Sequence, residues 1–181
     1  MKKIVLIAFS FLVINSMFSQ KMMTRAGEIK FEASMPALEE IEATNNTVSC
    51  IFDQTTGDFV ALALVKAFKF KSSLMEEHFN ENYIESSKFS KSTFKGKILN
   101  FDPAKISVTK ITYDLEGDLM MHGVTKRIKT KISLQVTNGK INATSNFLIK
   151  PQDYKIEIPS LVKNKIAENV KVVVNFVLEA K

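Results

Sequence analysis

Hydrophobic and polar residues alternate with a period of two along much of the chain, which is the pattern of β-strands that bury one face. The clearest segment is residues 124–136, where Ile128, Ile132 and Leu134 share one face and basic and polar residues occupy the other. The Asn138–Gly139 pair that follows is typical of a tight hairpin turn. Alternation then resumes over residues 141–149, so the sequence predicts a β-hairpin here.

The same alternation predicts further strands. They cover residues 27–33, 47–53, 59–70, 93–100, 106–121 (with a bend near Gly117) and 170–178. About eight antiparallel strands with short connections indicate an all-β protein, either a barrel or a sandwich. Closure into a barrel removes exposed strand edges, and a barrel of this size has room for one small ligand.

One segment follows helical rather than strand spacing. Between residues 73 and 83 apolar side chains recur every three or four positions, and Ser73 and Glu76 fit a capping box at the start. We therefore expect one short helix at this point. A second short helix or turn is expected over residues 161–167, directly after a proline.

The first residues have the pattern of a secretory signal peptide. Two lysines precede an almost unbroken apolar run over residues 4–14, which ends in small and polar residues. This run is shorter than the ~20 residues needed to span a bilayer. We expect residues 1–19 to be removed, which leaves a single domain over residues 20–181 that is exported to the periplasm or secreted.

Charge and cysteine content narrow the classes of partner. The formal charge of +6 is mild and spread along the chain, and no nucleic-acid-binding motif accompanies it. Its densest part, Lys126–Lys131, is either a solvated strand face or a contact for an anionic membrane surface. Cys50 is the one cysteine and lies in an apolar stretch, which favours a buried thiol over an intermolecular disulfide.

Recognised catalytic and metal-binding patterns are missing from the sequence. His78 and His122 are the two histidines, and neither has a cysteine or carboxylate at metal-ligand spacing. No nucleophile elbow, phosphate loop or dinucleotide fingerprint is present, so we expect no enzyme, metal or cofactor. Fourteen phenylalanines and no tryptophan fit either a packed core or an apolar ligand pocket.

Several motifs point to one family. The corner His122–Lys126, which reads His-Gly-Val-Thr-Lys, resembles the hallmark of the YceI-like family of exported lipid-binding proteins. The segment Met75–Phe79 resembles the short helical segment of that family, and the Asp153–Tyr154 pair also fits its layout. The resemblance implies an extended antiparallel barrel similar to a lipocalin, with an isoprenoid chain or related amphiphile inside and no shared catalytic residues.

Our leading hypothesis is a protein that binds a long-chain amphiphilic lipid of the isoprenoid or fatty-acid type. Aromatic side chains would surround the tail, the helix would cover one opening, and a histidine would contact the headgroup. The candidate ligand-binding residues are Phe68, Phe70, Met75, His78, Phe79, Phe94, His122, Phe147 and Tyr154. Two alternatives are an enzyme that uses His78 or His122 as a general base on an apolar substrate, and a solid-core barrel that binds a protein partner.

Overall fold

The structure is a computed structural model that describes residues 21–35 and 40–180. The strands of this part are Lys21–Ser34 (β1), Glu42–Asp53 (β2), Asp58–Leu64 (β3), Lys69–Phe70 (β4), Lys91–Ile98 (β5), Ile111–Met121 (β6), Val124–Thr137 (β7), Lys140–Ile149 (β8) and Ile166–Ala180 (β9). The α-helix Ser73–His78 (α1) continues into a π-helical turn, Phe79–Tyr83 (η2). Short 3-10 turns cover Val65–Ala67 (η1), Pro103–Lys105 (η3) and Pro151–Tyr154 (η4).

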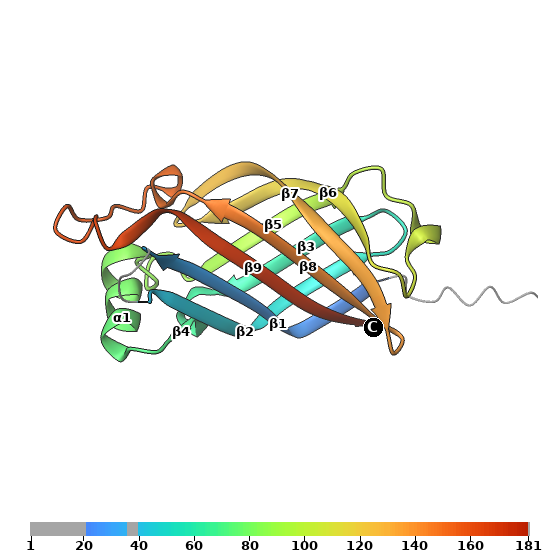
Figure 1. Ribbon diagram of the computed structural model, residues 1–181, viewed down its shortest axis with the longest axis horizontal. Helices are drawn as coiled ribbons and strands as arrows, with labels where there is room; N and C mark the ends of the chain where they lie inside the picture. Colours follow the sequence, from blue (N-terminus) through green and yellow to red (C-terminus); the bar gives the residue numbers. More distant parts are fainter. Residues whose placement is uncertain (1–20, 36–39, 181) are drawn as a thin grey trace, which may run out of the picture.

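Eight strands close into an antiparallel barrel. The order around it is β1-β9-β8-β7-β6-β5-β3-β2, and β2 pairs with β1 to close the circle. The short strand β4 extends the sheet beside β2. Figure 1 shows the strands crossing the barrel obliquely, with α1 at one end and the C-terminus at the other. The prediction of an all-β, lipocalin-like antiparallel barrel of about eight strands with a short helix is confirmed.

Two tight turns determine the pairing of β6, β7 and β8. Asn138 and Gly139 join β7 to β8 with φ angles of 52° and 74°, as the sequence predicts for this pair. His122 and Gly123 join β6 to β7 in the same way, with φ angles of 50° and 72°. A glycine at the second position adopts this left-handed conformation without the penalty that a Cβ brings. The predicted hairpin over residues 124–149 is therefore confirmed.

The strand predicted over residues 59–70 is interrupted. The chain leaves β3 after Leu64, makes the η1 turn, and pairs with β2 again at β4. Asn45 of β2 stabilises this break, because its buried Nδ2 donates to the Leu64 carbonyl oxygen at 3.0 Å. The Oδ1 atom of Asn45 accepts from the backbone N–H of Thr47 at 2.9 Å, so both ends of the amide are satisfied.

Other predicted boundaries also shift. The strand expected over residues 106–121 begins at Ile111, after a turn. The predicted capping residue is displaced by one position. The hydroxyl of Ser72, rather than that of Ser73, accepts a hydrogen bond from the Met75 backbone N–H. Residues 160–165 form turns, which is one of the two alternatives predicted for residues 161–167, and β9 begins at residue 166.

The predicted signal peptide, residues 1–19, lies outside the described residues. Within the part of the chain that the structure describes, no helix has both the length and the apolar character needed to cross a membrane.

Cys50 lies on the inward face of β2 and is almost completely buried. Burial raises the pKa of its thiol, because the thiolate is poorly solvated inside the barrel. We predict that a thiol reagent such as Ellman's reagent reacts with the folded protein far more slowly than with the protein unfolded in guanidinium. Equal rates in the two states would contradict this placement, and a Cys50→Ala variant gives the background rate.

Candidate ligand-binding cavity

The end of the barrel opposite α1 is filled by a chain of aromatic rings. Phe176 stacks on Phe59 with 6.1 Å between ring centroids, and Phe59 lies 6.0 Å from Phe52. Phe101 contacts Phe52 edge-on at 5.5 Å and Tyr113 at 5.7 Å. These rings and the buried leucines around them form a solid plug.

The end of the barrel at α1 is hollow. A cavity of about 520 Å³ lies inside it, a size typical of small-molecule sites. Apolar residues of β1, β6, β8 and β9 form its walls. The α1–η2 segment and residues 156–165 border it at the end of the barrel (Figure 1). A barrel that is solid at one end and hollow at the other can hold an apolar tail that enters from the α1 end.

Four phenylalanines form one wall of the cavity beneath α1. Phe31 of β1 contacts Phe68, Phe70 and Phe79, with ring centroids 5.4–5.7 Å apart. Phe79 also lies 5.1 Å from Phe70. All four line the cavity, so this cluster both holds the helix on the barrel and presents an apolar surface to the interior.

Few polar groups border the cavity. The exposed residues His78 of α1 and Lys165 of the loop before β9 are the ones that carry or can acquire positive charge. The hydroxyl of Ser72 also lies at this border, where it caps α1. Apolar walls with a few polar groups at the entrance suit a ligand with a long apolar part and a small polar end.

A second, smaller cavity of about 80 Å³ continues toward the centre of the barrel. It shares Ile29, Leu119 and Phe147 with the main cavity, and its other end is lined by Phe59 and Phe176 of the plug. The two cavities are therefore neighbours, and the smaller one lies between the main cavity and the plug.

The ring of Phe94 lies flat against the wall of this inner cavity. Gly96 of β5 pairs directly with Gly117 of β6, and the ring covers both glycines. A Cβ built on either residue would lie within 2.6 Å of the Phe94 ring. The two glycines thus give the Phe94 ring room to lie against the sheet at the wall of the inner cavity.

Most of the predicted ligand-binding residues meet in these cavities. The main cavity is lined by Phe68, Phe70, Met75, His78, Phe79 and Phe147, and the smaller one by Phe94 and again Phe147. His122 and Tyr154 lie outside both linings. Of the two candidate histidines, His78 therefore borders the cavity and His122 does not, and the contacts of His122 show what it does instead.

His122 links three segments of the backbone. Its Nδ1 atom lies 2.9 Å from the Tyr154 carbonyl oxygen, and its Nε2 atom lies 2.8 Å from a carboxylate oxygen of Glu85. The ring of Phe89 packs edge-on against the imidazole at 4.4 Å, and the His122 side chain is 9% exposed. Both ring nitrogens are engaged, so His122 ties the β6–β7 turn to the segment before β5 and to η4.

Tyr154 belongs to a small buried cluster beside the cavity, with Val65, Ile84 and Ile156. Burial, with a smaller effect from the neighbouring Asp153 carboxylate, raises the pKa of Tyr154 to about 12. The phenol of an unfolded chain titrates near pH ~10. The folded chain therefore holds this proton more tightly, and the resulting stability is complete below pH ~10 and lost as the pH rises toward ~12.

We predict that the free energy of unfolding falls by about 2 kcal/mol more for the wild type than for a Tyr154→Phe variant between pH ~9 and ~12. Urea unfolding at a series of pH values measures both proteins. Lysine titration affects the two equally, so only their difference reports Tyr154. Parallel curves for the two proteins would exclude a raised pKa at this residue.

Several lining residues were not among the predicted site residues. Phe31, Val170 and Val172 line the main cavity, and the alternation in β1 and β9 already places them on inward faces. The loop residues Ile158 and Val162 also line it. No periodic pattern marks these two, because their position depends on how the loop folds over the end of the barrel.

The chain forms a closed, lipocalin-like barrel with an apolar cavity at one end, and solved structures share the barrel fold. A polyisoprenoid-binding domain from Saccharophagus degradans, implicated in plant cell wall breakdown, has a TM-score of 0.76 and 20% identity, over 90% of this chain and 99% of that one. BcnA of Burkholderia cenocepacia has a TM-score of 0.68 and 12% identity, and the match covers 83% of this chain and 95% of that one. The YCEI protein of Campylobacter jejuni has a TM-score of 0.60 and 15% identity, and the match covers 79% of this chain and 88% of that one.

The sequence model of the YceI-like domain matches residues 14–178. The chain therefore belongs to the family of YceI-like domains, as the His122–Lys126 corner indicated. A search of curated proteins finds no match.

Proposed function

We propose that this protein binds a lipid with a long apolar tail of the isoprenoid kind. The tail lies in the barrel interior and the polar end lies between α1 and the loop before β9. The observation that carries the proposal is the cavity of about 520 Å³, with apolar walls and a few polar groups at its border. Each buried methylene contributes roughly 0.8 kcal/mol, so the tail supplies most of the affinity and headgroup selectivity is loose.

Family membership supports this proposal. The structural neighbour from Saccharophagus degradans is described as a polyisoprenoid-binding domain, and it covers nearly all of the barrel. Because the two sequences are 20% identical, this neighbour supports the class of ligand and not its identity.

A binding role fits the histidines better than a catalytic role does. A general base must reach its substrate, and the His122–Glu85 pair lies outside the cavity, with Phe89 on the imidazole. His78 does border the cavity, but within the described residues no hydrogen bond orients it. We therefore propose that the protein retains its ligand without transforming it.

The first residues support a proposal about location. The short apolar run after two lysines suits export, so we place the mature protein in the periplasm or outside the cell. N-terminal sequencing of the protein recovered from the periplasmic fraction tests this, and an intact Met1 in a cytoplasmic fraction would contradict it.

Native mass spectrometry of the protein purified without detergent, followed by organic extraction, tests the binding proposal. We expect a stoichiometric adduct that extracts as a long-chain lipid. A ligand-free mass, together with no uptake of added farnesol or geranylgeraniol, would refute the proposal. An affinity that depends on one particular headgroup and not on tail length would also contradict the proposal.

A further inference from the structure

The loop between η4 and β9 has an exposed apolar tip at the border of the cavity. Leu161 is 87% exposed, the highest value among the large apolar side chains of the described residues. Its neighbour Val162 lines the cavity, and Figure 1 shows this loop projecting beyond the barrel at the α1 end. Leu74 of α1 is 59% exposed and borders the same cavity. Exposed leucines on two elements that border one cavity make an apolar rim.

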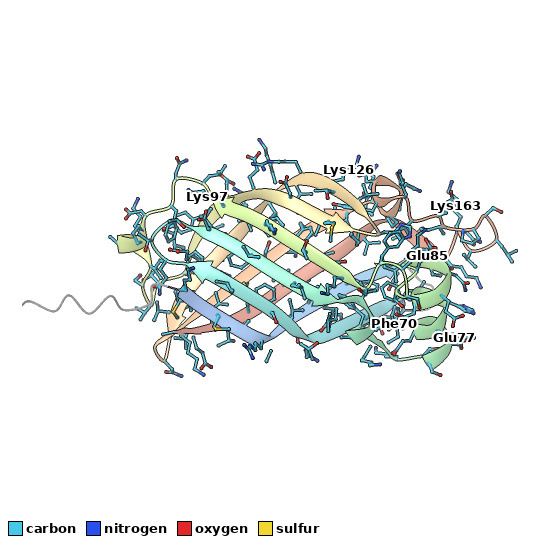
Figure 2. All side chains as sticks on the ribbon, turned by 180° about the vertical axis from the view of Figure 1, so that it is seen from behind. Phe70, Glu77, Glu85, Lys97, Lys126 and Lys163 are labelled. Carbon is cyan, nitrogen blue, oxygen red and sulfur yellow. The ribbon has the colours of Figure 1, made fainter. Side chains whose placement is uncertain are left out.

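Positive charge accompanies the tip. The turn from Ser160 to Lys165 contains Lys163 and Lys165 and no acidic residue. Both lysines are exposed, and Figure 2 shows Lys163 at the same end of the molecule as Glu77 of α1 and opposite Lys97. Lysines beside an exposed leucine suit a surface that is anionic outside and apolar beneath.

The basic stretch of β7 differs from this loop. Arg127 pairs with Glu116 at 2.9 Å, and Lys131 pairs with Asp114 at 2.9 Å. Acidic residues of β6 thus compensate the positive charge of β7 within the sheet. The loop before β9 is a better candidate for contact with an anionic partner than the densest basic segment of the sequence.

We propose that the rim formed by Leu161, Leu74, Lys163 and Lys165 docks the α1 end of the barrel on an anionic lipid bilayer. Leu161 and Leu74 enter the boundary between headgroups and acyl chains, and the lysines contact anionic headgroups. In this orientation the cavity faces the membrane, so an apolar tail passes between bilayer and barrel without crossing water. The role of docking in ligand transfer rests on the proposed function, whereas docking itself does not.

Two substitutions test the rim without changing the cavity lining. Leu161 and Lys163 line neither of the two cavities described above, so Leu161→Ser and Lys163→Gln leave the cavity walls intact. Val108 provides a matched control: it is 73% exposed, has Lys105 and Lys110 nearby, and lies between η3 and β6 at the other end of the barrel. A Val108→Ser variant removes a similar apolar surface from the end of the barrel opposite α1.

Flotation with vesicles of phosphatidylcholine and phosphatidylglycerol measures docking. All proteins compared have the same N-terminus, which is verified by intact mass. We expect Leu161→Ser to weaken association roughly tenfold, Lys163→Gln roughly fivefold, and Val108→Ser not at all. Vesicles of phosphatidylcholine alone should bind the wild type more weakly. Equal association of the wild type and all three variants with vesicles would overturn the proposal. That result is expected if the loop binds a protein partner instead.

Uptake of farnesol separates docking from ligand binding. Farnesol is offered either from solution or from the vesicles. We expect Leu161→Ser to bind farnesol from solution as the wild type does, but to take it up more slowly from vesicles. If the wild type binds farnesol from solution and does not associate with vesicles, docking is refuted and the proposed function stands. Association that depends on Leu161, with no farnesol binding, would uphold docking and refute the proposed function.

Discussion

An Ala63→Phe variant is expected to bind farnesol roughly fiftyfold more weakly than the wild type while it remains folded. Ala63 points inward from β3 and lines the main cavity. A phenyl ring at this position takes the room of about three methylene groups of the tail, each worth ~0.8 kcal/mol. The ring enters existing empty space, so the stability of the barrel should change little. Isothermal titration and urea unfolding measure the two effects.

The same substitution at Ala43 provides the control. Ala43 is also buried, but it lies in packed core and does not line either cavity. Ala43→Phe should destabilise the barrel by about 1–3 kcal/mol through overpacking, and its folded fraction should bind farnesol normally. If Ala63→Phe bound farnesol as tightly as the wild type, the cavity could not be the binding site.

Period-two alternation predicted what is local in this fold. It placed Ile132 and Leu134 on the buried face of β7, and both are buried in the structure. It failed where a distant side chain changes the path of the chain. The break after Leu64 depends on Asn45, 19 residues away, so nothing within residues 59–70 predicts it.

The roles of the aromatic residues depend on long-range pairing in the same way. Phe59 and Phe68 are both buried phenylalanines in apolar stretches, yet one belongs to the plug and the other to the cavity wall. Which end of the barrel each one occupies follows from strand direction and from closure of β1 on β2. Composition alone could therefore not separate a packed core from an apolar pocket, and the protein contains both.

His122 shows the same limit at a single residue. The His-Gly pair predicts a turn, and the positive φ angles confirm it. Its partners Glu85 and Tyr154 are 37 and 32 residues away, so the sequence left the direction of the imidazole open. The His122–Lys126 corner that is typical of the family thus connects segments of the structure beside the cavity, whereas His78 on α1 borders the cavity itself.

A Phe176→Ala variant is expected to change which tail the barrel prefers. Phe176 and Phe59 form the inner end of the smaller cavity, so they limit how far a tail can reach. Inward side chains of β9 from Val170 to Phe176 span roughly 20 Å of strand, or about 15 Å along the axis of a tilted barrel. Removing the Phe176 ring lengthens this space. Affinity for geranylgeraniol should rise relative to farnesol, in spite of a loss of about 3–5 kcal/mol in folding stability.

Leu178→Ala separates tail selection from lost stability. Leu178 is the next inward residue of β9, is fully buried, and lines neither cavity. Its truncation should cost about 2–5 kcal/mol and leave the ratio of geranylgeraniol to farnesol affinity at the wild-type value. Competition between the two alcohols, measured by native mass spectrometry below the unfolding temperature, gives this ratio for each protein. If both variants changed the ratio alike, general loosening would explain the effect. If neither did, the tail would not reach the plug, and its length limit would lie nearer α1.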